Sequence, residues 1–499
     1  MKNITYNIIT LVSFVFVFTA CNDILDETPD NRTAIDSPEK IAELLVGAYP
    51  DAAYAPFLEP MSDNADDKGP SAEDFRVNEE MYFWNDLNDT DEDTPTNYWN
   101  RAYKAIAQAN QALASIEELG GGSELNPLKG EALICRAYAH FMLVSIFSKA
   151  YNPSTSSSDL GIPYVLKPET VLLGDYERGT VENVYTNIKK DIEAGLPLIQ
   201  DNYNVPAFHF TKKAANAFAS RFYLNTGEWQ KVIDHSTIAL GIGGASVLRD
   251  WENEYRPKTY DEQGLRYASA TLEPANLLLV SAESTYEYYG QYATARYQLS
   301  ADLVDIIFPS ANGTGQPWSY AIYGSGGALY NNIPKFNTYF KVTNQAAGIG
   351  NAYLGYVLLS TDEALLNRAE AYAMLGQLDN AVVDINLSYS VKTRFYDPAL
   401  DELTVSDIQT RFEVTDGGLY TPFYNIPAEA LAFVNAVLTI KRTIFYSEGI
   451  RWFDIKRHHI AIDHRDIFNN SFLLPKDDNR RAVQIPEAAQ SFGIEQNPR

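Results

Sequence analysis

Two distant segments of the chain can be aligned with each other, and this internal repeat restricts the fold more than any other feature of the sequence. Residues 214–240 align with residues 363–389 in such a way that Gly227 matches Gly376. In each copy, apolar and small residues recur at helical spacing before the glycine and again after it. Each copy is therefore predicted to be a pair of helices joined by a tight glycine turn, similar to a tetratricopeptide unit.

The first half of the chain has the same helical character. Apolar and small residues recur every three or four positions over 98–119, and again over 126–149 after an Asn-Pro pair that is typical of a helix start. A further helix is predicted over 180–199. We therefore expect an all-α fold of tetratricopeptide-like helical repeats, in which Cys135 is a buried small residue of the second helix.

Long segments rich in Gly, Asn, Pro and Tyr interrupt these helices, mainly at about 54–97, 241–345 and 391–430. Apolar runs at 277–281 and 356–360 predict a few short strands or buried links. Long insertions of this kind usually carry function when they are ordered. We expect a single domain over residues 36–499, with a ligand-facing side that is loop-rich and partly irregular.

The N-terminus has the features of an exported lipoprotein. Lys2 precedes an apolar stretch that ends at Phe18, and Cys21 follows after Thr19 and Ala20, so residues 1–20 are predicted to be a signal peptide. The run Phe-Thr-Ala-Cys resembles a bacterial lipobox, although Phe18 stands where Leu is usual. We expect Cys21 to carry lipid and residues 21–35 to form an acidic leader at the membrane surface. The alternative is a soluble exported protein in which Cys21 is incidental.

The chain is strongly acidic, with 39 Lys and Arg against 65 Asp and Glu and a net charge of −26. A nucleic-acid ligand is not expected, because a protein with this negative charge repels the phosphate groups of the backbone. The sequence has no Gly-x-Ser-x-Gly, His-Glu-x-x-His or P-loop motif, so we expect neither an enzyme nor a cofactor. No metal site is predicted. The acidic run Asp86–Asp93 leaves a calcium ion and a plain solvated loop as alternatives, without the pattern of an EF-hand.

Several motifs in a fixed order resemble the SusD/RagB family of surface nutrient-binding lipoproteins. The resemblance begins at Cys21 and continues through Trp99 and Tyr103, which match a family helix, and through the segment 136–153. It ends in the segment 440–458, IKRTIFYSEGIRWFDIKRH, which resembles the C-terminal signature of the family. The resemblance implies tetratricopeptide-like helices packed under an irregular face, and a binding protein rather than an enzyme.

The resemblance also implies a role at the cell surface. Such a protein is anchored by lipid to the outer membrane and acts as a lid on a SusC-like TonB-dependent transporter, to which it delivers an oligomeric nutrient. We expect an oligosaccharide as the ligand, whereas a RagB-like member would take an oligopeptide. A structural or adhesive surface protein that binds other proteins through its helical repeats is a further alternative.

Aromatic residues in the loops are the expected ligand contacts, because a ring can stack on a sugar face or pack against a peptide side chain. Trp99, Trp229 and Trp452 lie in helical segments and are expected in the core. The predicted ligand-binding residues form three groups: Trp318, Tyr320 and Tyr323; Tyr288 and Tyr289; and Asp63, Asn64 and Trp84. The polar pair in the third group would hydrogen-bond hydroxyl groups or backbone amides.

Charged residues of the C-terminal signature are expected to serve the fold. They recur every third position, which predicts a ladder of alternating charge along one helix. These residues are Glu448, Arg451, Asp454 and Arg457. The histidines that close or follow the signature, His458, His459 and His464, lack the spacing of metal ligands and are expected at the surface.

Overall fold

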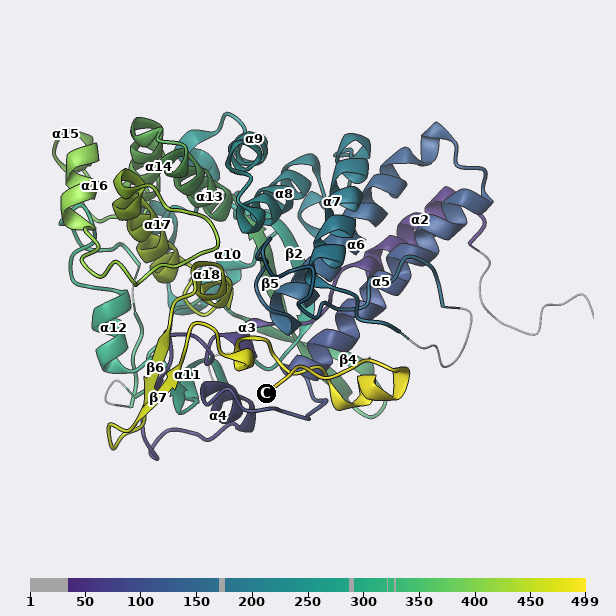
Figure 1. Cartoon of the computed structure of the whole chain (residues 1–499), viewed down its shortest axis with the longest axis horizontal. Coiled ribbons are helices and arrows are strands. Elements are labelled where there is room, and N and C mark those ends of the chain that lie inside the picture. The colour runs from purple at the N-terminus through teal and green to yellow at the C-terminus, as the bar shows by residue number, and fades with distance from the viewer. Residues whose placement is uncertain (1–34, 170–175, 287–290, 321, 327–328) are drawn as a thin grey trace, which may run out of the picture.

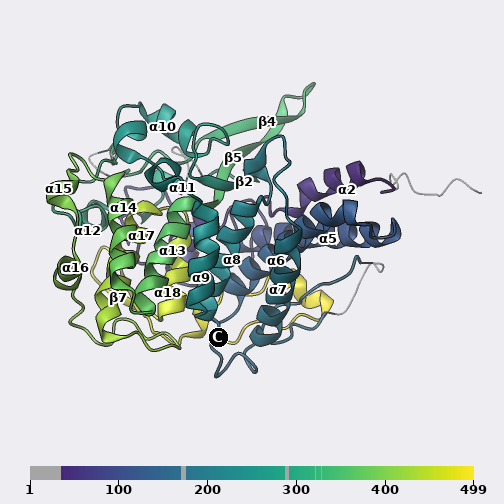
Figure 2. The same cartoon turned by 90° about the horizontal axis from the view of Figure 1, so that it is seen from above.

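The computed structural model describes residues 35–169, 176–286, 291–320, 322–326 and 329–499. Its scaffold is a row of helices that stand side by side across the molecule (Figures 1 and 2). The row comprises α5 (Pro95–Glu118), α6 (Asn126–Phe147), α7 (Val181–Gly195), α8 (Lys212–Thr226), α9 (Trp229–Leu240), α13 (Thr361–Met374), α14 (Leu378–Ser390) and α17 (Leu431–Ile444). This helical scaffold confirms the predicted fold class.

The two copies of the sequence repeat are the helix pairs α8–α9 and α13–α14, and α13 packs directly against α9. The first helix of each pair begins at a hydroxyl cap, because the side chains of Thr211 and Ser360 accept hydrogen bonds from the backbone of the first turn. Gly227 and Gly376 both have a φ of 72°, a left-handed conformation that lets the chain fold back into the second helix. The predicted repeat is confirmed.

A small antiparallel sheet with the strand order β2–β5–β4 contacts α8 and α13. Its strands are β2 (Asn276–Glu283), β4 (Thr338–Asn344) and β5 (Ile349–Ser360). The apolar runs 277–281 and 356–360 lie in β2 and β5, where Leu278 pairs with Leu359, so these predicted strands are confirmed. The β4–β5 hairpin extends away from the body of the molecule (Figure 2).

The remaining elements are short. The helices are α2 (Pro38–Leu45), α3 (Ala55–Leu58), α4 (Arg76–Tyr82), α10 (Tyr260–Tyr267), α11 (Gln291–Thr294), α12 (Ala301–Ile307), α15 (Pro398–Asp401), α16 (Val405–Arg411) and α18 (Ile450–His458). Two separate two-stranded sheets complete the fold: β1 (Asp66–Asp67) pairs with β3 (Tyr297–Gln298), and β6 (Ile462–Arg465) pairs with β7 (Ser471–Leu474). Figure 1 places α3, α4, α11, α12 and the β6–β7 hairpin below the helix row, where irregular segments gather.

Helix α6 is the central core helix of the first half. By length and composition the stretch Ser123–Phe147 could cross a membrane, but 94% of its apolar window is buried inside the protein. Cys135 on this helix is 1% exposed, which confirms it as a buried residue. The predicted signal peptide, residues 1–20, and nearly all of the predicted leader, residues 21–35, lie outside the described residues. Export and lipidation therefore stay predictions.

Replacing Gly376 by alanine tests the glycine turn of the second repeat. A Cβ at this position would meet no atom within 4 Å, so the cost is that of the left-handed backbone alone. We expect Gly376→Ala to lower the free energy of unfolding by about 1 kcal/mol, measured by chemical denaturation. Gly417→Ala is the matched control, because Gly417 is equally open but does not have a left-handed φ. Equal stabilities of the two variants would contradict the role of the turn.

Candidate functional site

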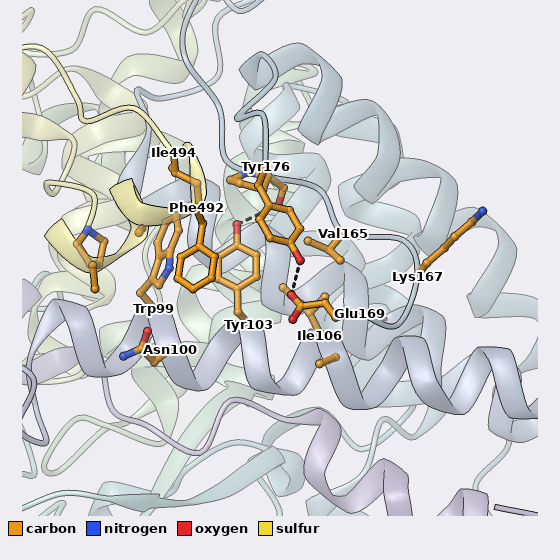
Figure 3. A pocket seen from close by; sticks show the side chains of 15 residues that line it. Trp99, Asn100, Tyr103, Ile106, Val165, Lys167, Glu169, Tyr176, Phe492 and Ile494 are labelled. Atoms are coloured by element: carbon orange, nitrogen blue, oxygen red, sulfur yellow. Dashed lines mark hydrogen bonds between the residues drawn. The ribbon is translucent and has the colours of Figure 1, made fainter. Parts of the chain in front are cut away.

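A pocket of about 190 Å³ opens between α5, the segment 163–169 and the C-terminal residues 486–494 (Figure 3). Its lining combines aromatic rings with a few polar side chains, a composition that is common in small-molecule sites. The aromatic members are Trp99, Tyr103, Tyr176 and Phe492, and the polar members are Asn100, Lys167 and Glu169. We call this cavity the aromatic pocket.

Helical spacing places Trp99 and Tyr103 on the same face of α5, with their ring centroids 4.8 Å apart. The Trp99 ring also meets the edge of the Phe147 ring on α6 at 4.9 Å. Trp99 is 5% exposed, so most of the ring packs in the core while one edge borders the pocket. The Tyr103 hydroxyl donates a hydrogen bond of 2.9 Å to the carbonyl of Pro163, which holds the opposite wall in position.

Tyr176 joins the two irregular walls of the aromatic pocket. Its backbone N–H donates to the carbonyl of Phe492 at 2.9 Å, and its hydroxyl donates to Oε1 of Glu169 at 2.5 Å. Burial and the neighbouring carboxylate raise the pKa of Tyr176 to about 12, so the hydroxyl stays protonated at neutral pH. Figure 3 shows these side chains on the pocket side of their segments, opposite the rings of α5.

A buried ion pair behind the pocket fixes the loop that carries Val165. Arg136 on α6 makes two hydrogen bonds of 2.7 Å to the carboxylate of Asp191 on α7, and one of 2.9 Å to Asn110 on α5. The Asn110 amide in turn donates to the carbonyl of Val165 at 2.9 Å. Three helices and one loop thus share a single polar cluster, which sets the shape of the pocket wall.

His140 holds the same loop from the other side. Its Nε2 accepts a hydrogen bond of 3.1 Å from the Val165 N–H, and its Nδ1 donates to the carbonyl of Arg136 at 2.8 Å. The ring also stacks on Tyr164, with centroids 3.8 Å apart. Burial lowers the pKa of His140 to about 3, so the ring is neutral and can accept at Nε2.

This arrangement is suited to binding a ring-shaped or apolar-faced ligand. The aromatic side chains offer edges and faces for packing, while Lys167, Glu169 and Asn100 supply donors and acceptors at the rim. Among the described residues, no group of three or more His, Cys, Asp and Glu side chains could hold a metal ion.

Sequence reasoning missed the aromatic pocket. Periodicity assigned Trp99 to the core, which is correct for most of the ring but hides the edge that faces the pocket. Tyr176 and Phe492 lie in segments without a periodic pattern, so nothing in the sequence brought them next to α5. The one available signal was the pair Trp99 and Tyr103 on one helix face, followed by aromatic residues outside the helices.

The predicted platform around Trp318 is buried in this structure. Trp318 is 9% exposed and Tyr320 is 6% exposed. Trp318 packs between the rings of Trp251 and Tyr389, each 5.8 Å away, and Tyr320 stacks on Trp251 at 4.5 Å. The prediction of a surface platform is therefore wrong here, because the Gly-rich loop folds its aromatic side chains inward. A ligand could reach either ring only if this loop opened.

Tyr323, the third member of that group, is half-buried and separate from the other two. Its ring meets the Tyr260 ring edge-on at 5.0 Å, and its backbone pairs with Asn332 through two hydrogen bonds of 2.9 Å. Tyr288 and Tyr289 lie outside the described residues, so their role stays a prediction.

The third predicted group, Asp63, Asn64 and Trp84, does come together, but its polar groups bind internal partners. Asp63 forms hydrogen bonds of 2.8 and 2.9 Å with Arg451. Burial alone would raise the pKa of Asp63, yet Arg442 and Arg451 bring it below the usual range. The carboxylate is therefore already occupied by two guanidinium groups.

Asn64 and Trp84 are likewise committed to internal partners. Asn64 is 0% exposed and donates to Glu59 at 2.9 Å, and the Trp84 Nε1 donates to the carbonyl of Met61 at 2.9 Å. Trp84 also stacks on His464 at 4.4 Å. The surface position expected for His464 is wrong, because its ring lies between aromatic rings and its two nitrogens lie 2.7 and 2.8 Å from backbone carbonyls.

The charged residues of the C-terminal signature serve the fold, but not as one ladder. Glu448 precedes α18 and pairs with Lys335, whereas Arg457 pairs with Glu370 on α13. Only Asp454 and Arg457 bind each other, at 3.1 Å. His458 is 0% exposed and lies 3.4 Å from Glu370, so its predicted surface position is also wrong.

The acidic run Asp86–Asp93 does not converge on one point. Asp86 pairs with Arg499 at 2.7 Å, while the Asp89 carboxylate accepts from the backbone N–H of Asp91. Asp93 is buried and binds Ser284. These three carboxylates thus have separate partners.

Comparison with known proteins gives one consistent result. Residues 23–224 match a family model for SusD-like proteins, described as starch-binding and associating with the outer membrane. A SusD superfamily protein from Bacteroides thetaiotaomicron has 21% sequence identity and a TM-score of 0.67, and the match covers 93% of this chain and 100% of that one. A putative sugar binding protein from Bacteroides vulgatus has 19% identity and a TM-score of 0.64, over 93% and 99% of the chains. No curated protein matches significantly.

Acid is expected to weaken the protein through His140. The pKa of this histidine is about 3 in the folded protein and about 6.5 when unfolded. The unfolded chain binds more protons between these values, so stability falls as the pH drops below about 6.5. We expect His140→Gln, which cannot be protonated, to lose less stability than the parent between about pH 7 and about pH 5. Urea unfolding at both pH values measures this, and equal losses would contradict the role of His140.

Proposed function

We propose that this chain, which is similar to SusD-like proteins over residues 23–224, is a cell-surface lipoprotein that binds an oligosaccharide and delivers it to a SusC-like TonB-dependent transporter of the outer membrane. The matching family is described as starch-binding and associating with the outer membrane, and one similar structure is a putative sugar binding protein. Both descriptions support a carbohydrate as the ligand, and the family description supports the outer membrane as the location.

The observation that carries the proposal in this chain is the aromatic pocket. A sugar ring has an apolar face that packs against aromatic side chains and hydroxyl groups around its edge that need hydrogen bonds. Tyr176 and Phe492 supply the packing surface, and Lys167 and Glu169 lie where hydroxyl groups would reach the rim. The pocket holds one or two rings of a longer chain, so the rest of an oligosaccharide would extend over the surface.

The proposed location depends on lipid attached to Cys21. We expect Cys21→Ser to move the protein from the outer-membrane fraction to the soluble fraction, because no thiol remains for lipidation. The measurement is cell fractionation followed by immunoblotting, and gently solubilised parent protein should bring a transporter-sized β-barrel with it on purification. Parent protein that migrates alone, together with unchanged nutrient uptake after its deletion, would contradict the lid role.

Removing aromatic surface from the pocket tests the ligand site. We expect Tyr176→Ala and Phe492→Ala each to weaken oligosaccharide binding by about tenfold, because a ring that packs on the ligand is lost. Isothermal titration calorimetry with glycans retained from a mixed pool gives the affinities. Phe395→Ala is the matched control, since Phe395 is a 68% exposed aromatic residue close to α15, at the other end of the helix row (Figure 1).

The pool experiment also separates the alternatives. The protein is incubated with mixed glycans and mixed peptides, and the retained species are identified by mass spectrometry. If the parent retains peptides and Tyr176→Ala does not, the ligand of this pocket is an oligopeptide and not an oligosaccharide. Glycan binding that survives in both pocket variants would contradict the assignment of this pocket, and retention of neither class would contradict nutrient capture by the isolated protein.

A further inference from the structure

A second cavity, of about 160 Å³, lies where the C-terminal ends of α6 and α18 meet the segment 476–481. We call it the basic pocket, because four cationic side chains border it in a chain whose net charge is −26. These are Lys149, Lys456, Lys476 and Arg481. Its residues are separate from those of the aromatic pocket, so a ligand bound here would be independent of the proposed function.

Lys456 lies at the base of the basic pocket and is 4% exposed. Its ammonium group donates hydrogen bonds of 2.6 Å to the carbonyls of Ser145 and Ser148 at the end of α6. An ammonium group has three N–H donors, so one remains after these two bonds. No carboxylate lies within ion-pair distance of Lys456 in the part of the chain that the structure describes.

Arg481 is the second buried cation, with 6% exposure. Its guanidinium group donates at 2.9 Å to the carbonyls of Ile455 and Ile460, at the end of α18. Within the described ranges, Arg481 also lacks a carboxylate at ion-pair distance. Burial lowers the pKa of Arg481 to about 10, and burial together with the nearby Arg481 lowers the pKa of Lys456 to about 7.

Three carboxylates also border the cavity, but two already have cationic partners. Asp478 binds Arg480 through hydrogen bonds of 2.8 and 3.0 Å, and Asp159 lies 3.5 Å from the ammonium group of Lys149. Asp477 is exposed on the rim. The two cations at the base therefore lack a direct counter-ion.

Helix capping explains only part of this arrangement. The carbonyl groups at the end of a helix satisfy N–H donors and carry about half a negative charge per helix. Two basic groups remain next to each other in a buried place, and charging both is costly unless an anion compensates them, which is why the pKa of Lys456 falls. An anion that entered the cavity would meet the free N–H of Lys456 at the base and the side chains of Lys149 and Lys476 at the rim.

We propose that the basic pocket binds an oxyanion: the sulfate, phosphate or carboxylate group of a small molecule or of a substituted sugar. The cavity has room for a group of this size, since one water molecule occupies about 30 Å³ of the liquid. Charge-assisted hydrogen bonds from lysine to oxyanions are short and strong. The same group would neutralise the charge that Lys456 and Arg481 leave uncompensated.

Calorimetric titration of the full chain with sodium sulfate, inorganic phosphate and sodium glucuronate tests the proposal, with chloride keeping the ionic strength constant. We expect saturable binding of at least one of these anions. At about pH 7.5 binding should also take up protons, because an anion beside Lys456 raises its pKa, and the measured heat should then depend on the ionisation enthalpy of the buffer. Sulfate and phosphate binding would assign a tetrahedral group, and glucuronate binding alone a carboxylate.

The double variant Lys149→Ala/Lys476→Ala removes the rim charges and leaves the two buried cations in place. We expect it to weaken anion binding by about tenfold, whereas the control Lys341→Ala, on the exposed β4 strand, should bind as the parent does. Absence of saturable binding for all three anions, or equal affinities of the double variant and the parent, would overturn the proposal. Either result leaves glycan binding at the aromatic pocket intact, so the two proposals fail separately.

Discussion

The buried ion pair between Lys335 and Glu448 is the interaction on which the rest of the structure depends. Lys335 is 0% exposed, and its ammonium group lies 2.7 Å from the Glu448 carboxylate. The same group donates at 2.8 Å to the carbonyls of Ile444 and Tyr446, where α17 ends. Tyr267, at the end of α10, donates to the same carboxylate. Loss of one partner would leave a buried charge unpaired, at a cost of about 3–5 kcal/mol. The pair thus fixes segments that are far apart in the sequence at one point.

The turn next to this ion pair extends its effect to the N-terminal half. Glu59, just after α3, accepts hydrogen bonds from the backbone N–H groups of Ser447 at 2.9 Å and Gly449 at 3.0 Å. Gly449 has a φ of 74°, and a Cβ there would lie 3.0 Å from the Cα of Ala55. The Glu-Gly pair of the signature is therefore required by packing: the acid binds the buried lysine, and the glycine lets α3 approach. Helix α18 begins directly after Gly449, and its C-terminal end borders the basic pocket.

The sequence predicts the parts of this fold that repeat, and loses accuracy where side chains pack by tertiary contact alone. Helical spacing and the glycines at 227 and 376 fixed the helix pairs, because both signals are local. The prediction that Trp318 and Trp84 lie at the surface failed, because it depended on loop composition and not on such a local signal. Their loops were predicted correctly from Gly, Asn and Pro, but composition does not reveal whether a loop ring points outward or into the core. Aromatic residues of the loops were expected to contact the ligand, yet Trp318 is 9% exposed and Trp84 is 2% exposed, so position in a loop did not mean exposure.

The C-terminal segment shows why neither pocket was predicted from the sequence. Residues 476–481 border the basic pocket and residues 486–494 border the aromatic pocket, yet neither stretch has a periodic pattern. What positions them is attachment to α6: the N–H of Val483 donates to the carbonyl of Ile146 at 3.0 Å, and the Asn497 amide donates to that of Phe147 at 2.9 Å. The end of one core helix therefore supports both cavities. Substitutions in the segment 476–494 can change the lining of either pocket without disturbing the helical repeats. One scaffold can therefore accommodate different ligands.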